Sequence, residues 1–242
     1  GAYPARCTVT DADGDTGTSG TKSVTGETDT PAPVEPTEKT VVPVAGTDRY
    51  RTAVEASQES YPDGAANVVI ATGVNWPDAL GGSALAGAVE GPLLLTKPGE
   101  LPSAVVAEIT RLGAKDAYIL GGTAAITQAV EDALNATLSG TVTRIAGPNR
   151  YGTANLVADA VINLRGSAFS GGAYIATGDN FPDALGASPL AASSATPILL
   201  AKPDGTPYLP SKVDSAVILG GPAAVTPATE AAVRAELGTS NV

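Results

Sequence analysis

An arginine followed by a tyrosine occurs at two related places in the sequence, as Arg49-Tyr50 and Arg150-Tyr151. A guanidinium group can bind a phosphate or carboxylate through two hydrogen bonds, and an aromatic ring beside it can stack on the face of a sugar. The alternative is structural: each tyrosine anchors the first turn of a helix, and each arginine pairs with a neighbouring acid. The pairs therefore indicate either a site for an anionic saccharide or a repeated packing element.

A second motif also occurs twice, as Asn75-Trp-Pro-Asp78 and Asn180-Phe-Pro-Asp183. Proline fits the first turn of a helix, so the asparagine is the expected N-cap and the aspartate lies near the positive end of the helix dipole. We expect the aromatic residues in the core rather than stacked on a sugar. One carboxylate per copy supplies no acid–base pair unless the copies face each other, so the motif favours binding over catalysis.

Lys97 and Lys202 each follow an apolar run and precede a proline, where they face either a bound polymer or only solvent. With the two motifs they complete the set of candidate polymer-binding residues: Arg49, Tyr50, Asn75, Asp78, Lys97, Arg150, Tyr151, Asn180, Asp183 and Lys202.

Glycines at the ends of predicted strands form a second set of candidates, because backbone N–H groups before a helix can face an anion. They are Gly73, Gly121, Gly122, Gly178, Gly220 and Gly221. None lies in a complete G-x-G-x-x-G motif or a P-loop, so tight turns and close helix–strand packing are the favoured interpretation.

The composition excludes several classes of site. The 242 residues include no histidine and one cysteine, which rules out histidine-based triads, histidine-containing zinc sites and an intrachain disulfide. With 14 basic and 25 acidic residues the net charge is −11, so we expect no nucleic acid partner. No apolar run is long enough to span a membrane, and no motif calls for a cofactor.

The first 40 residues differ from the rest. Residues 1–27 can form a β-hairpin around the turn Asp11-Ala-Asp-Gly-Asp15, and the stretch resembles the last hairpin of a PKD-like or immunoglobulin-like extracellular domain. Asp11, Asp13 and Asp15 are a weak calcium candidate, since Lys22 stands where the EF-hand pattern needs a glutamate; a plain Asp/Gly turn is the alternative. Residues 28–40, rich in proline and threonine, predict an extended linker.

From residue 41 the sequence repeats itself. The block around Arg49-Tyr50 recurs 101 residues later, the A-T-G-x-N block and the L-L-x-K-P block recur after 105, and I-L-G-G recurs after 99. Four blocks in one order define two copies of a unit of about 100 residues. We assign the copies to residues 41–143 and 144–242.

Each copy alternates short apolar runs with helical patterns. Residues 68–71, 92–95 and 117–120 have the pattern of strands buried on both faces, and Ser103 is the expected cap of a helix over 103–112 that stops at Gly113. The second copy is nine residues short at this helix, which leaves apolar surface without cover. The fold class is therefore α/β: two tandem repeats, each a small, mostly parallel sheet flanked by helices (Rossmann-like or toprim-like).

The motifs R-Y-x-T-A, A-T-G-x-x-[W/F]-P-D-A-L, L-L-x-K-P and I-L-G-G resemble the type 2 cell-wall-binding repeat of Gram-positive surface proteins, over residues 44–238. The resemblance implies a non-catalytic module of a secreted protein that binds a cell-wall polysaccharide or an anionic secondary polymer. It also implies repeats in threes, so either another copy of the chain is a partner that supplies the third repeat, or the given sequence stops before that repeat.

Two other functions remain open at this point. The repeats could form a structural, self-assembling segment, or, with less support, a hydrolase acting on wall glycans. The net charge opposes simple electrostatic capture of an anionic polymer, so the basic side chains must cluster or a divalent cation must bridge.

Overall fold

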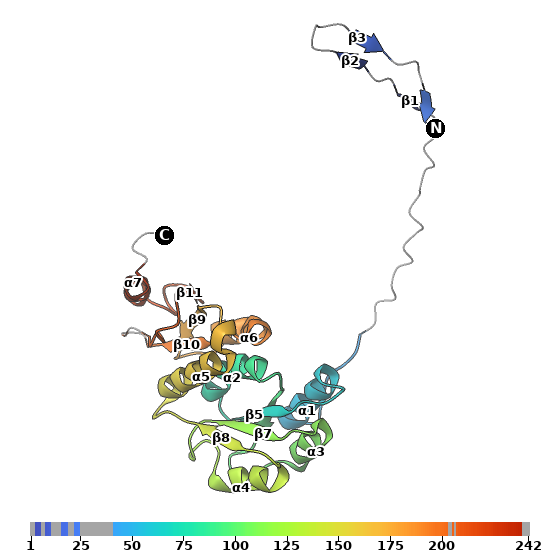
Figure 1. Cartoon of the computed structure of the whole chain (residues 1–242). Coiled ribbons are helices and arrows are strands. Elements are labelled where there is room, and N and C mark those ends of the chain that lie inside the picture. The colour runs from blue at the N-terminus through green and yellow to red at the C-terminus, as the bar shows by residue number, and fades with distance from the viewer. Residues whose placement is uncertain are drawn as a thin grey trace. The chain divides into compact units, whose positions relative to one another are not determined.

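A computed structural model describes residues 3–5, 8–10, 16–18, 22–24, 41–202, 205 and 207–238. The chain divides into two compact units, Gly1–Pro43 and Val44–Val242, which we describe separately (Figure 1).

The first unit contains antiparallel strands. β1 (Tyr3–Ala5) pairs with β4 (Lys22–Val24), and β2 (Thr8–Thr10) pairs with β3 (Thr16–Thr18). Both antiparallel pairings are those of the predicted hairpin. The aspartate turn proposed for calcium and the linker 28–40 lie outside the described residues.

The first repeat forms a four-stranded parallel sheet in the order β6-β5-β7-β8. Its elements are α1 (Arg49–Ser60), β5 (Asn67–Thr72), α2 (Pro77–Ala88), β6 (Leu93–Thr96), α3 (Ser103–Leu112), β7 (Asp116–Leu120), α4 (Gln128–Thr137) and β8 (Val142–Ile145). The central strand β5 is almost entirely buried, as its apolar run predicts.

The second repeat forms a three-stranded parallel sheet in the order β10-β9-β11. Its elements are α5 (Arg150–Arg165), the short 3₁₀ helix η1 (Gly166–Ala168), β9 (Gly172–Thr177), α6 (Pro182–Ser194), β10 (Ile198–Ala201), β11 (Ser215–Ile218) and α7 (Pro227–Glu236). In the described residues between β10 and β11 no helix corresponds to α3, which confirms the predicted shortening.

Local capping explains where the helices begin. The side chain of Asp48 accepts a hydrogen bond from Arg51 N–H (2.8 Å), and Asn149 caps α5 in the same way. The prediction that Ser103 caps α3 is wrong, because Pro102 occupies the cap position and Ser103 is the first residue of the helix. Gly113 ends α3 in the left-handed conformation (φ 66°), as expected.

Asn75 and Asn180 were also wrongly predicted as caps. Each side-chain oxygen accepts a hydrogen bond from the next residue, Trp76 N–H (3.0 Å) or Phe181 N–H (2.9 Å). Trp76 and Phe181 themselves occupy the cap positions, without a side-chain cap bond. The aspartates do lie in the first turn of their helices, as predicted.

The two repeats share a hydrophobic core centred on α2. Leu80 and Leu85 of this helix are buried in one cluster with Val157 of α5 and Ile198 of β10. Figure 1 shows α2 beside α5 and α6. At Gly87 the backbones of α2 and α6 approach so closely that a Cβ atom would collide with the carbonyl group of Ala192. The repeats are therefore joined by direct helix packing.

A buried carboxylate ties α3 to α1. Glu108 accepts hydrogen bonds from Ser57 (2.5 Å) and Gln58 of α1 and forms an ion pair with Arg111 (2.8 Å). Burial raises the pKa of Glu108, but these hydrogen bonds and the charge of Arg111 outweigh burial, so its pKa lies below the ordinary value.

The second repeat, which lacks this helix, has different residues at the positions that receive it. Ala158 stands in place of Ser57, and Asp159, in place of Gln58, accepts a hydrogen bond from Tyr208 Oη (3.0 Å). Tyr208, from the segment before β11, thus replaces one of the polar contacts that Glu108 makes.

We predict that Glu108→Gln lowers the free energy of unfolding by about 3 kcal/mol near neutral pH, because Arg111 loses its buried counter-charge. The lowered pKa means that the stabilisation from Glu108 is present above the ordinary glutamate pKa and is lost as pH falls through the folded-state pKa. Urea unfolding between neutral and acid pH measures both effects. Glu100→Gln, at the exposed Lys97–Glu100 pair, is the control; equal effects of the two substitutions would contradict the prediction.

Candidate functional site

The two arginines of the repeated pair make equivalent contacts. Arg49 and Arg150 begin α1 and α5, and their guanidinium groups donate hydrogen bonds to the carbonyl oxygens of Gly73 and Gly178. Each arginine thus binds a backbone carbonyl where the structural interpretation expected an acid, and the charge of Arg150 acts on Asp78 as well. Each arginine is held at the carboxyl end of the central strand of its own repeat.

The tyrosines pack against these same glycines. A Cβ atom on Gly73 would collide with the ring of Tyr50, and one on Gly178 would collide with the ring of Tyr151. The glycine in A-T-G is therefore needed for a close approach between ring and backbone. Tyr151 Oη also donates a hydrogen bond to Asp179 Oδ1 (3.0 Å).

Arg150 also reaches across to the first repeat. Its guanidinium lies 5.0 Å from the centre of the Trp76 ring, a cation–π distance. The Trp76 ring in turn contacts Phe181, with ring centres 5.7 Å apart and planes tilted by 52°. The expectation that both aromatics belong to the core is wrong for Phe181, which is exposed, and Trp76 is only partly buried. Both lie where the repeats meet.

Asp78 lies at the same junction. Its carboxylate packs against Gly121, where a Cβ atom would be 2.5 Å from Oδ2. Burial raises the pKa of Asp78, and a hydrogen bond from the Thr153 side chain and the charge of Arg150 only partly offset it. Both of these groups come from α5 of the second repeat. Asp183 makes the equivalent contact with Gly220 of the second repeat, where a Cβ atom would also be 2.5 Å from Oδ2.

Thr153 was not among the predicted site residues. Its hydroxyl oxygen accepts a hydrogen bond from Gly147 N–H (3.2 Å), and Thr52 makes the same contact with Gly46 in the first repeat. The threonine of R-Y-x-T-A was the available signal, but the motif alone does not show that it faces a carboxylate of the other repeat.

A cavity of about 420 Å³ opens at this junction. It is lined by Thr72, Val74, Asn75, Pro77, Asp78, Pro98, Ala124, Ala125 and Arg150. The guanidinium, amide and carboxyl groups around it can bind hydroxyl groups and one anionic group of a saccharide. A smaller cavity of about 370 Å³ is lined by Arg49, Thr72, Gly73, Val74, Asn75, Trp76, Ala79 and Leu95. Thr72, Val74 and Asn75 thus line two cavities, each with one arginine.

The two lysines differ in their contacts. Lys97 pairs with Glu100 (2.9 Å), whose hydrogen bond and charge raise the lysine pKa. Lys202 lies 5.5 Å from the centre of the Tyr151 ring and lines a separate cavity of about 500 Å³ in the second repeat, together with Tyr208. The structure thus does not bring all the predicted cations together.

Half of the glycine N–H groups proposed to face an anion have partners within the fold. Gly73 N–H donates to Thr96 O, Gly178 N–H to Ala201 O, and Gly121 N–H to Ile145 O, each at 2.9 Å. For these three glycines the anion-facing role is a wrong prediction, because sheet pairing uses the N–H group. Gly121 and Gly220 have positive φ angles (99° and 96°), which supports the tight-turn interpretation. For Gly122, Gly220 and Gly221 the anion-facing role stays a prediction.

The described residues contain neither a metal-binding cluster of side chains nor a membrane-spanning helix. No group of three or more histidine, cysteine, aspartate and glutamate side chains there is placed to hold a metal ion. Of the helices in the described ranges, none combines the length and apolar character needed to cross a bilayer.

Comparison with known families agrees with this architecture. The family model for cell wall binding domain 2 (CWB2) matches residues 44–131 and 144–230, one match for each repeat. The chain belongs to the cell wall binding domain 2 family. It is therefore a cell-wall-binding module, and its place is at the cell wall or cell surface.

Relatives in this family include two proteins of Bacillus subtilis (strain 168). N-acetylmuramoyl-L-alanine amidase LytC is 30% identical over 195 residues, covering 78% of this chain and 38% of the relative. Amidase enhancer is 31% identical over 188 residues, covering 77% of this chain and 25% of the relative. The chain thus spans less than two fifths of either relative, so the match does not favour the hydrolase alternative.

Two solved structures from Clostridium difficile share the fold. Cwp6 matches with a TM-score of 0.70 and 27% identity, covering 79% of this chain and 31% of that one. Cwp8 matches with a TM-score of 0.70 and 26% identity, covering 82% and 34%. The predicted α/β class is confirmed.

We predict that Arg150→Ala lowers the free energy of unfolding more than Arg49→Ala does, by about 1 kcal/mol, because only Arg150 also stacks on Trp76. Each substitution removes one hydrogen bond to a glycine carbonyl, so Arg49→Ala is a matched control. Chemical unfolding followed by circular dichroism measures the difference. Equal losses would show that the contact across the junction contributes nothing.

Proposed function

We propose that this module retains a secreted surface protein at a Gram-positive cell wall, without covalent attachment, by binding a wall polysaccharide or anionic secondary polymer at the repeat junction. The observation that carries the proposal is the cavity of about 420 Å³ to which Asn75 and Asp78 of the first repeat and Arg150 of the second all contribute. The remaining candidates from the sequence analysis, Tyr50, Tyr151, Asn180, Asp183 and Lys202, are proposed as contacts for further units of the same polymer.

The arrangement of arginines answers part of the problem raised by the net charge of −11. Arg49 and Arg150 flank the same segment, from Thr72 to Trp76, so two cations serve one surface. Lys97 is already paired with Glu100 and adds little. We propose that affinity rests on two arginines together with hydrogen bonds to sugar hydroxyls, and therefore has a modest dependence on salt.

The module is proposed to act without catalysis. Asp78 is the carboxylate of the junction cavity, and it is engaged by Thr153 and by the charge of Arg150. Glycoside hydrolysis ordinarily uses two carboxyl groups on either side of the bond. Asp183, which packs on Gly220 of the other sheet, does not supply the second one to this cavity.

Self-association is a second candidate function, favoured by the surface of α6. Leu185 is 54% exposed, whereas its equivalent Leu80 in α2 is 4% exposed because the second repeat covers it. Leu190 is exposed as well, and its equivalent Leu85 is buried. Covering such a leucine contributes about 2 kcal/mol. We propose that another copy of the chain covers this face in the place of a third repeat.

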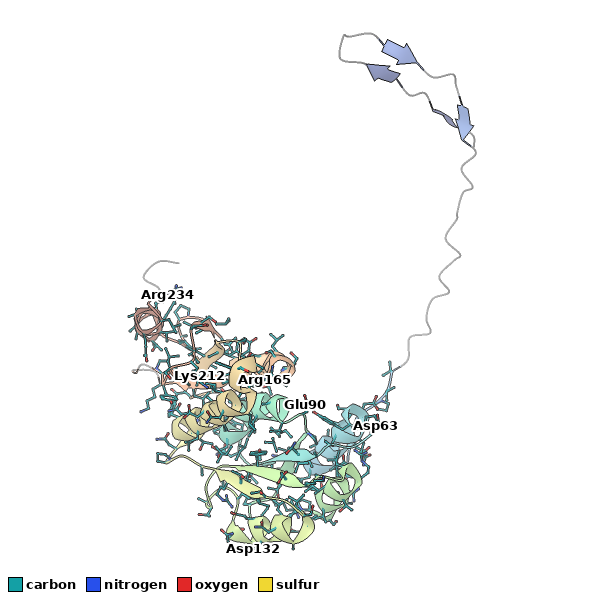
Figure 2. The ribbon with its side chains drawn as sticks, in the orientation of Figure 1. Asp63, Glu90, Asp132, Arg165, Lys212 and Arg234 are labelled. Atoms are coloured by element: carbon teal, nitrogen blue, oxygen red, sulfur yellow. The ribbon has the colours of Figure 1, made fainter. Side chains whose placement is uncertain are left out.

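We predict that the chain co-sediments with purified Gram-positive walls and that removal of the secondary polymers by acid abolishes binding. Arg49→Ala and Arg150→Ala should each weaken binding about tenfold, since each removes a charged hydrogen-bond donor from the proposed site. Arg165→Ala is the charge-matched control; Arg165 lies at the end of α5 and is labelled in Figure 2.

Equal weakening by all three substitutions would show charge attraction without a site. Unchanged binding to stripped walls would exclude a secondary polymer and leave the peptidoglycan as the ligand. Absence of binding by the folded chain would overturn the proposed function.

A further inference from the structure

The junction cavity contains a negative charge beside its donors for an anion. Of the described side chains that line it, Asp78 of α2 is the one carboxylate and Arg150 of α5 is the one cation. Figure 1 shows these two helices side by side. Because a carboxylate repels an anionic polymer, its presence in the cavity restricts which ligands can bind there.

The other polar side chains of the cavity offer hydrogen-bond donors. Arg150 uses one N–H group on Gly178 O (2.7 Å) and has further N–H groups for a ligand. The side-chain oxygen of Asn75 accepts from the N–H of the next residue (3.0 Å), which leaves its NH₂ group to donate. Thr72 Oγ1 accepts from Val74 N–H (3.3 Å) and keeps its own hydrogen. The three side chains can together hold one anionic group of a ligand.

The negative charge of Asp78 is only partly compensated by its neighbours. Among the described residues its carboxylate has no ion-pair partner. The guanidinium of Arg150 is held by Gly178 O and the Trp76 ring, and it acts on Asp78 through its charge. Burial raises the pKa of Asp78, because the Thr153 hydrogen bond and this charge offset only part of the burial. Such a carboxylate gains most from a ligand that brings a positive charge.

The contact of Asp78 with Gly121 is a structural role that Asp78 shares with Asp183. In both repeats a Cβ atom on the glycine, Gly121 or Gly220, would be 2.5 Å from the aspartate Oδ2. This contact therefore belongs to the fold of each repeat. Asp78 also lines the junction cavity, whereas Asp183 is absent from the lining of that cavity. Asp183 thus provides a control that separates the structural contact from ligand binding.

An ammonium group of the ligand fits this carboxylate better than a divalent cation does. Calcium takes about six to eight oxygen ligands, and the cavity offers it a single carboxylate. An ammonium group carries three hydrogens and is held by one carboxylate through a charge-assisted hydrogen bond. The volume of about 420 Å³ lies within the range of sites for small molecules, so one sugar unit with its substituents can enter.

We propose that the polymer unit bound in this cavity carries a free amino group as well as an anionic group, with the ammonium at Asp78 and the anion at Arg150 and Asn75. The inference rests on the proposed function and names the class of polymer. The amino group belongs either to an amino sugar without an acyl group or to an aminoacyl ester. A unit with both charges also reduces the repulsion between an anionic polymer and a chain of net charge −11.

The first test compares two sugar phosphates: glucosamine 6-phosphate carries an ammonium group where glucose 6-phosphate carries a hydroxyl. Titration of the chain with each, followed by NMR at neutral pH, should show at least about tenfold tighter binding of glucosamine 6-phosphate, because only its ammonium pairs with Asp78. Asp78→Asn should abolish this preference, whereas Asp183→Asn, at the equivalent glycine contact, should keep it. Equal or absent binding of the two sugars by the parent chain, or a preference retained in Asp78→Asn, would overturn the inference.

The second test uses purified Gram-positive walls and needs no variant. Acetic anhydride converts free amino groups to neutral amides and leaves the anionic groups, so it should weaken co-sedimentation of the parent chain about tenfold. Mild alkali removes aminoacyl esters; weakening by alkali assigns the amino group to an ester, and retained binding assigns it to an amino sugar. Equal binding to untreated and acetylated walls would overturn the inference and leave the proposed function standing. Absence of binding to untreated walls would overturn the proposed function and the inference with it.

Discussion

The packing of α2 against α5 and α6 is the interaction on which the rest of the structure depends. α2 belongs to the first repeat, yet Leu80 and Leu85 are buried in a cluster that contains residues of both repeats. Burial of each leucine contributes about 2 kcal/mol, more than a surface ion pair such as Lys97–Glu100 provides. The small residues that allow this approach, above all Gly87 against Ala192, therefore determine how the repeats are oriented.

The candidate site follows from that orientation. Arg150 and Thr153 come from the first turn of α5, and they reach Trp76 and Asp78 only because α5 lies against α2. Within its own repeat, Arg150 makes the same carbonyl contact as Arg49, so the geometry of each arginine is set locally. The same local unit thus makes only a contact within its own repeat in one copy, and in the other it also lines a cavity where the two repeats meet.

Much of the fold could be predicted from the sequence, because burial on both faces leaves a local signal. The runs around Ile70 and Ile119 and the missing helix of the second copy were read correctly. The packing partners of these helices and strands could not be predicted, because an apolar pattern indicates that a segment is buried but not which segment covers it. The contacts of Trp76 with Phe181 and of Asp78 with Thr153, and the membership of β8 in the first sheet, are therefore visible only in three dimensions. The prediction that Asn75 and Asn180 are N-caps was wrong because each side-chain oxygen accepts a hydrogen bond from the N–H of the next residue.

The measurement that tests the composite site most directly is calorimetric titration of a soluble wall polymer into the chain and its Gly87→Ala variant. A methyl group at Gly87 must push α2 away from Ala192 of α6, while the Gly186→Ala control meets open space. The account predicts that Gly87→Ala weakens binding at least about tenfold, or about 1.4 kcal/mol, with Gly186→Ala unchanged. Equal affinity of the two folded variants would contradict a site built by both repeats.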